Sequence, residues 1–366
     1  MLSVPFLSFP PGIQLEIVKS MDLRELVKFS SCSRQTFQIA KSAQVEIEEM
    51  DAAFFENCLD VEFDDYSVCI NPMYRQRNPI EDVEFTGFCG LQMYEFPTSH
   101  SDGSVEWNCI VLVPEGKTFL ETSDTVLGYL TSLFHGFEFA KWRVAPVEPV
   151  MRGLQKYFPK FDEICVFNGT IRQEEDRLMT KEEAKFMLEE FEVTRYLWVI
   201  ARIEEGFQYS KGFNQDRVNL DYPSWMHWDA IINSSCRCIR LHHVRAVSSA
   251  DLNRLLKLWV SNEKLQGLGS LTLYMDYYEC LSFPEGLMEL VLEGIDHEDL
   301  DMERWAPRGY YHEELPFTRQ IRRVDGKLAA VKKRKQVIID LNDTQHVINS
   351  SYFTGKWQFS GASKSS

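Results

Sequence analysis

The sequence predicts an α/β protein built in three parts, and three observations lead to this class. Apolar residues recur at helical spacing in the first 41 residues, and short alternating runs between about 59 and 114 are typical of antiparallel strands. Helical and strand patterns alternate from about residue 122 onward. A chain of 366 residues has room for two or three domains. We therefore expect a helical module at 1–45, an acidic linker and β-rich layer at 46–121, and a larger α/β domain at 122–358.

Two short helices are predicted in the N-terminal module. Pro10-Pro11 can open the first helix, because Pro is tolerated at a first helical position. Asp22 can cap the second helix, and Glu25 stands three residues later, as a capping box requires. Helices this short bury their apolar faces only against a partner or the rest of the chain. The apolar residues of the first helix recur at Ile13, Ile17 and Met21.

These residues resemble the F-box, the module that attaches a substrate receptor to the Skp adaptor of an SCF ubiquitin ligase. Phe9-Pro10 stands where the family has Leu-Pro, Ile17-Val18 where it has paired aliphatics, and Asp22-Leu23 matches Asp-Leu. The closing stretch from Phe29 to Arg34 also matches, and the run LVKFSSCSRQ resembles the nematode family that carries a type 2 F-box-associated domain. Three features depart from the family pattern: Gly12 replaces the usual Glu, the turn at Met21-Asp22 is short, and Phe37 stands near the customary Trp.

The resemblance implies a set of residues that bind the adaptor. An N-terminal helical hairpin docked on its own domain is the structural alternative to such a module. The implied residues, some of which must instead tie the module to the body, are Phe6, Leu7, Phe9, Pro10, Ile13, Ile17, Val18, Leu23, Leu26, Val27 and Phe29.

The remainder of the chain is predicted to begin with an acidic linker or short helix at 43–56. Antiparallel strands are expected at 83–85, 92–94, 105–107 and 109–113, with turns at Gly87, Gly90 and Asp102-Gly103. Helices are then expected at 123–134, 147–158, 180–191, 224–233 and 250–260. Strands are expected at 137–139, 164–167, 196–199, 238–241, 271–273 and 290–292.

Several of these strands fit the apolar-x-x-apolar-x-apolar template that leucine-rich repeats use. The intervals between matches are irregular, which favours a degenerate leucine-rich-repeat-like α/β array with some antiparallel β-structure. The stretch 222–353 also resembles the type 2 F-box-associated domain, through the helix at 249–259 and a hairpin turn at Asp325-Gly326. The template matches begin at Phe134, Phe161, Cys236, Leu268 and Leu287.

Charge and cysteine content limit the class of protein. The net charge is −16, and residues 46–124 carry 18 acidic and three basic groups. An acidic balance argues against nucleic acid as a partner, and a solvated face explains the acidic block better than steering of a basic partner.

Nine scattered Cys fit a reducing compartment, and the longest apolar run, at 196–201, is too short to span a membrane. We expect an intracellular protein of the cytoplasm or the nucleus. The basic run at 332–335 could be a nuclear-localisation signal, but an exposed edge strand rich in Lys explains it better.

No catalytic, cofactor or metal site is predicted. Gly116-Lys117-Thr118 lacks the earlier Gly of a phosphate loop, because Val111 stands there, and Cys236, Cys238, His242 and His243 are better explained as core residues than as zinc ligands.

The sequence thus favours a substrate receptor that binds a Skp-type adaptor, through it a cullin scaffold, and an unidentified protein substrate. One alternative is a leucine-rich-repeat-like interaction protein with no ligase role, whose N-terminal helices form a cap with Leu7, Pro10 and Ile17 buried. The other is an α/β enzyme. Aromatic residues that could bind substrate if they are exposed include Trp225, Trp228 and Tyr310-Tyr311, although aromatic residues more often belong to the core.

Overall fold

A computed structural model describes most of the chain, in two compact units. One unit comprises Met1–Ala246 with Leu273–Leu281, and the other Val247–Thr272 with Ser282–Ser366. The domain boundaries expected from the sequence stay a prediction. The described residues are 5–47, 50–55, 57–63, 66–70, 84–88, 91–99, 105–135, 141–167, 178–244, 248–275, 286–299, 317–333 and 336–340.

The first unit begins with short helices, as predicted. Pro10 and Pro11 occupy the N-cap and first position of α1, and Asp22 forms the expected capping box with Glu25 at the start of α2. A further helix, α3, was not predicted; it begins with a second capping box, between Ser33 and Thr36. The elements are η1 (Phe6–Ser8), α1 (Pro11–Lys19), α2 (Leu23–Ser31) and α3 (Arg34–Ser42).

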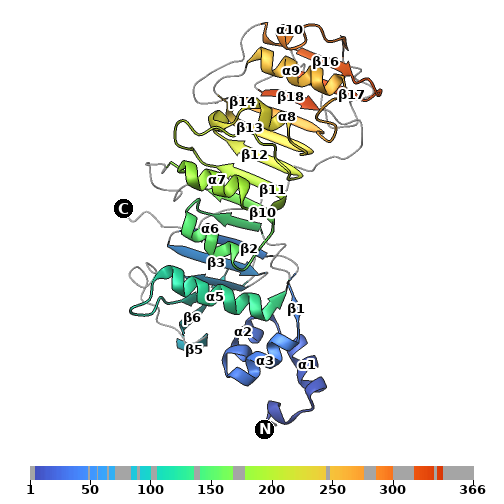
Figure 1. Cartoon of the computed structure of the whole chain (residues 1–366). Coiled ribbons are helices and arrows are strands. Elements are labelled where there is room, and N and C mark those ends of the chain that lie inside the picture. Colours follow the sequence, from blue (N-terminus) through green and yellow to red (C-terminus); the bar gives the residue numbers. More distant parts are fainter. Residues whose placement is uncertain are drawn as a thin grey trace. The chain divides into compact units, whose positions relative to one another are not determined.

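A mixed sheet forms the body of the first unit (Figure 1). The hairpin expected from 83–85 and 92–94 is present as β5 and β6, although Gly87 lies inside β5 and not in a turn. The stretches 105–107 and 109–113 were expected as two antiparallel strands, but 105–111 forms the single strand β7, which pairs antiparallel with β6. β2 pairs antiparallel with β3, and β3 with β4, while β4 and β7 are parallel. This half contains β2 (Met50–Phe55), β3 (Cys58–Phe63), β4 (Tyr66–Ile70), β5 (Glu84–Phe88), β6 (Leu91–Ser99) and β7 (Val105–Val111).

The other half of this sheet is parallel, and its strands lie side by side in chain order from β9 to β13. β9 also pairs parallel with β2, which joins the two halves. This order confirms the α/β class with some antiparallel strands. The strands are β9 (Lys141–Val144), β10 (Phe161–Phe167), β11 (Val193–Ile200), β12 (Arg217–Asp221) and β13 (Cys238–Val244).

Helices α5, α6 and α7 lie along one face of this sheet (Figure 1). Alternate strand residues point toward them, and the aromatic cluster of Trp142, Phe158, Phe161 and Phe191 fills the space beneath. Burying such rings supplies much of the stability of the array. The helical elements are α5 (Phe119–Leu133), α6 (Glu148–Gln155), α7 (Lys181–Glu189), η3 (Pro223–Trp225) and α8 (Trp228–Ile232), and a separate parallel pair joins β1 (Val45–Glu46) to β8 (Phe134–His135).

The second unit contains α9 (Ser249–Val260), α10 (Leu287–Val291) and the antiparallel strands β15 (His297–Asp299), β16 (Phe317–Arg322), β17 (Leu328–Lys333) and β18 (Gln336–Asp340). α9 has the predicted apolar face, with Leu252, Leu255, Leu256 and Trp259 buried. The predicted hairpin turn at Asp325-Gly326 joins β16 to β17. Strand β14 (Ser270–Met275) contains residues of both units.

Four local predictions require correction or fall outside the described residues. The stretch expected to be a linker or short helix at 43–56 contains strand β2 in the centre of the sheet. The strand expected at 290–292 is largely helix α10, in which Leu290 is 54% exposed. Lys332 and Lys333 lie in β17, which pairs on both sides with β16 and β18 and is not an edge strand. The strand expected at 137–139 and Tyr310-Tyr311 lie outside the described residues.

Candidate protein-interaction site

The segment before α1 is held in place by the side chain of Gln14. This side chain is only 8% exposed, and its amide nitrogen Nε2 donates to the backbone carbonyls of Leu7 (3.3 Å) and Phe9 (2.8 Å). The ring of Phe6 packs edge-on against that of Phe29 in α2, with 4.9 Å between ring centroids. Residues 6–10 therefore form one surface with α1 and are not a loose tail.

Three of the residues implied in adaptor binding are completely buried. Val18, Leu26 and Val27 have exposed fractions of 0%, so they form the interior of the module. They lie beneath the exposed residues of the module and are not available for direct contact with a partner.

Apolar side chains remain exposed on the outer side of α1 and the segment before it. Leu7 is 45% exposed and Ile13 is 48% exposed, Pro10 is exposed, and Phe9 and Ile17 are half-buried. Pro10, Ile13 and Ile17 have the spacing of one helical face. We call Leu7, Phe9, Pro10, Ile13 and Ile17 the N-terminal apolar surface. Phe6, Leu23 and Phe29, the other implied residues, are half-buried.

Helix α2 is joined to the sheet by an ion pair with Glu95 on β6. The Glu95 carboxylate is 3% exposed and lies 3.0 Å from the Arg24 guanidinium and 2.5 Å from Lys28 Nζ. The Arg24 guanidinium also stacks on the ring of Trp107, 3.1 Å from its centroid, and Tyr66 donates to Glu95 at 3.4 Å. Removing one partner of a pair whose carboxylate is this buried costs more than breaking a surface pair.

Tyr129 on α5 provides a second attachment of the module. Its hydroxyl bonds the Ser30 hydroxyl and lies 3.4 Å from the Val27 carbonyl, and its ring packs on Phe37 of α3 at 5.2 Å. The module thus contacts the body through α2 and α3. The cap alternative required Leu7, Pro10 and Ile17 to be buried against the body, and Leu7 and Pro10 are exposed.

The acidic block at 46–124 is not simply a solvated face, as the sequence had suggested. Glu95 is buried against α2. Asp60 and Glu62 share the face of β3 that points away from Leu59, Val61 and Phe63. Burial raises the pKa of Asp60 to about 6, against the effect of nearby Arg143. Burial and the Asp60 charge raise the pKa of Glu62 to about 7.

The sheet face opposite α5, α6 and α7 carries polar and aromatic side chains along β11 and β12. Trp198 Nε1 lies 3.4 Å from Asp221 Oδ1, and Asn219 Nδ2 donates to the Tyr196 hydroxyl at 2.7 Å. Trp198, Tyr196 and Asp221 are half-buried, and burial raises the pKa of Asp221. We call these four residues the opposite-face strip. This face could not be chosen from the sequence, because β12 is too short and polar for its pairing with β11 to be predicted.

The Trp and His residues considered as substrate-contact or metal-binding candidates differ in their surroundings. Trp225 is 3% exposed and is part of the core, not an exposed contact residue, whereas Trp228 is half-buried. His242 stacks on Tyr274 and His243 on Tyr222, each with 4.4 Å between ring centroids. In the ranges that the structure describes, no group of three or more His, Cys, Asp or Glu could hold a metal ion, and no helix is long and apolar enough to cross a membrane.

Comparison with known families identifies two regions of this chain. An F-box domain spans residues 6–47, which covers η1 to β1, and an F-box-associated domain spans residues 209–273, which covers β12 to most of β14. The resemblance inferred from the sequence is thereby confirmed. F-box domains generally bind Skp-type adaptors, and both domains are typical of adaptor proteins rather than enzymes. No curated protein and no solved structure matched the chain.

Proposed function

We propose that this F-box protein is the substrate-recognition subunit of an SCF-type ubiquitin ligase. It binds a Skp-type adaptor through the N-terminal apolar surface, and through the adaptor a cullin scaffold. The observation that carries the proposal is the exposure of Leu7, Pro10 and Ile13 on a module whose other side is attached to the sheet. Apolar side chains fixed on a supported surface are what a stable protein interface requires.

The implied adaptor-binding residues divide into two groups. The N-terminal apolar surface makes the direct contact, together with the accessible parts of Phe6, Leu23 and Phe29. Val18, Leu26 and Val27 hold that surface in shape. Covering the exposed half of a side chain such as Ile13 contributes about 1 kcal/mol, so several such residues are needed for a firm complex.

The substrate binds the α/β body, and the opposite-face strip supports this assignment. Parallel strands in chain order, backed by helices, support a leucine-rich-repeat-like body, and arrays of this kind offer extended faces for binding. Trp and Tyr side chains are common centres of protein interfaces. The chain itself performs no bond chemistry; it raises the effective concentration of a substrate lysine near a ubiquitin-loaded enzyme. This role places the protein in the cytoplasm or the nucleus.

A reconstitution experiment tests the proposal. The full chain, a recombinant Skp-type adaptor and a cullin are mixed and separated by gel filtration. We expect all three to elute together, and the chain and cullin to elute apart when the adaptor is omitted. Separate elution of the chain in the presence of adaptor would contradict the proposal and favour an interaction protein with no ligase role.

A further inference from the structure

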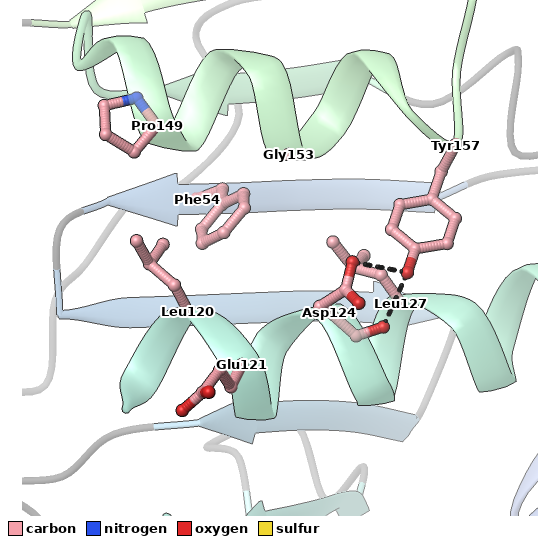
Figure 2. Close-up of a pocket in the computed structure, with 8 residues that line it drawn as sticks. All are labelled: Phe54, Leu120, Glu121, Asp124, Leu127, Pro149, Gly153 and Tyr157. Carbon is pink, nitrogen blue, oxygen red and sulfur yellow. Dashed lines mark hydrogen bonds between the residues drawn. The ribbon is translucent and has the colours of Figure 1, made fainter. Parts of the chain in front are cut away.

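A groove between α5 and α6 is occupied by groups of the chain itself (Figure 2). Phe54 and Leu127, which line it, are only 2% and 1% exposed. The Tyr157 hydroxyl donates to the Asp124 carboxylate at 2.6 Å, and Lys156 Nζ contacts the same carboxylate at 2.7 Å. The polar groups here are already paired, whereas the opposite face of the sheet carries cations that are not.

Arg240 extends the opposite-face strip onto β13. In the register of the parallel strands, Arg240 lies beside Asn219, and Asn219 lies beside Trp198. Ile239 and Leu241, the neighbours of Arg240 in the chain, are 0% and 1% exposed and belong to the core. Because side chains alternate along a strand, Arg240 points to the same face as the strip.

The guanidinium of Arg240 has no acceptor among the described residues of the chain. Its side chain is half-buried, and it forms no ion pair or hydrogen bond with any residue that the structure describes. Asp221, the carboxylate of the strip, lies instead 3.4 Å from Trp198 Nε1. A guanidinium carries five N–H donors and pairs best with a carboxylate. A partner that brings a carboxylate therefore supplies what Arg240 lacks.

A second cation, Arg202, is held in place beside the strip by a stack of rings. Its guanidinium carbon lies 4.7 Å from the ring centroid of Tyr222, and the Tyr222 ring stacks on that of His243. Tyr222 and His243 have positive φ angles of 53° and 55°, which few residues other than Gly adopt. Arg202 is exposed and has no ion pair with a described residue, although Glu204 and Glu205 follow it in the chain.

The ring stack borders the strip at Asp221. Tyr222 directly follows Asp221 in the chain, and His242 pairs with Asp221 in the strand register. Burial raises the pKa of Asp221, and the neighbouring His242 and His243 act against this effect. The Asp221 carboxylate is thus held by groups of the chain, and the donors of Arg202 and Arg240 remain for a partner.

We propose that the opposite-face strip binds an acidic segment of the substrate protein, whose Asp or Glu carboxylates pair with Arg240 and Arg202. The inference rests on the proposed function in taking that partner to be a substrate. Trp198 and Tyr196 offer ring surface to the rest of the segment. A basic segment would leave both guanidinium groups unpaired and would be repelled by them.

Fluorescence polarisation at low ionic strength tests the proposal with the full chain. The probe is fluorescein-labelled Gly-Glu-Gly-Glu-Gly-Glu-Gly-Glu-Gly, in which an extended backbone places the carboxylates about 7 Å apart along one side. The control peptide has Gln in place of each Glu. A net charge of −16 repels acidic peptides in general, so binding of this probe requires a local cationic site. We expect the Glu peptide to bind about tenfold or more tightly than the Gln peptide.

Three protein variants locate the binding. Arg240→Gln and Arg202→Gln should each weaken binding of the Glu peptide about tenfold. Lys185→Gln removes the same charge from an exposed position on α7, on the helix-covered face, and should bind as the wild type does. Arg202 is exposed, so its substitution leaves the fold intact even if Arg240→Gln does not fold.

Four results would overturn the acidic-segment site. They are no binding of the Glu peptide, equal binding of the two peptides, wild-type binding by either folded Arg variant, and equal weakening by Lys185→Gln. Adaptor binding is measured on the same samples, so a failure of the proposed function is recognised separately.

Discussion

Glu95 holds the N-terminal module against the sheet, so Glu95→Gln should loosen α2. Its carboxylate is 3% exposed and faces two cations, Arg24 and Lys28, which are 27% and 33% exposed. The substitution keeps the shape of the side chain and removes its charge. Two partly buried cations then face an amide that cannot neutralise them.

The cost can be bracketed from the burial of the three groups. Removing one partner of a fully buried ion pair costs about 3–5 kcal/mol, whereas a surface pair contributes about 0–1 kcal/mol. Because the carboxylate is buried and the cations are partly solvated, we expect an intermediate value of about 2–3 kcal/mol. Local opening of α2 should then become about 30- to 150-fold more frequent.

Hydrogen–deuterium exchange of peptides covering 23–31 measures this opening. Glu148→Gln is the matched control, because Glu148 pairs with Arg152 on an exposed helix surface and should leave α2 unchanged. Acceleration of less than about threefold in Glu95→Gln, or equal acceleration in the control, would refute the role assigned to Glu95.

Three further predictions concern the sheet, helix α6 and the second unit. The folded-state pKa of Asp60, about 6, lies above its ordinary value of 3.8. Its contribution to stability is therefore present below pH 4 and lost as the pH rises through 6. The free energy of unfolding should fall between pH 4 and 8, and Asp60→Asn should make that fall about 2–3 kcal/mol smaller. Glu148→Gln should show the same fall as the wild type, and an unchanged fall in Asp60→Asn would contradict the prediction. Gly153 lies inside α6, and a Cβ there would meet only Phe54 Cε1 at 3.9 Å, so Gly153→Ala should raise the free energy of unfolding in urea by about 0.5–1 kcal/mol; a loss of stability would contradict this. Trp259→Ala removes a ring that is fully buried in the second unit, and should destabilise that unit by about 3–5 kcal/mol. Exchange should accelerate in α9 and stay unchanged in α5, and equal acceleration in both would mean that the two units do not unfold separately.

Features that depend on neighbouring residues could be predicted from the sequence. Pro10-Pro11 and Asp22 begin their helices, and Asp325-Gly326 forms its turn, because each acts on backbone groups a few residues away. The apolar strand residues of β10 and β13 also point to the core as expected. In each case the signal lies within one element.

Features that depend on distant residues could not be predicted. β2 has acidic flanks and pairs on one side with the neighbouring β3 and on the other with β9, about 90 residues later, and no local pattern indicates that second pairing. β12 offers just Val218 and Leu220 to the core, too few to stand out as a strand. Glu95 and Arg24 are 71 positions apart, and no local pattern connects them. The short apolar run at 287–292 fits a strand or a helix equally, and burial of Leu287, Met288 and Val291 settles it as helix.

Isothermal titration of a Skp-type adaptor into three forms of the full chain tests the central claim most directly. The forms are wild type, Ile13→Asp and Leu178→Asp, since Ile13 and Leu178 have nearly equal exposed fractions of 48% and 46%. Placing a charge in the N-terminal apolar surface should weaken adaptor binding about 30-fold or more, because the carboxylate is desolvated without a partner. Leu178→Asp should bind as the wild type does. Equal affinity of Ile13→Asp and wild type, or no binding by wild type, would contradict the account.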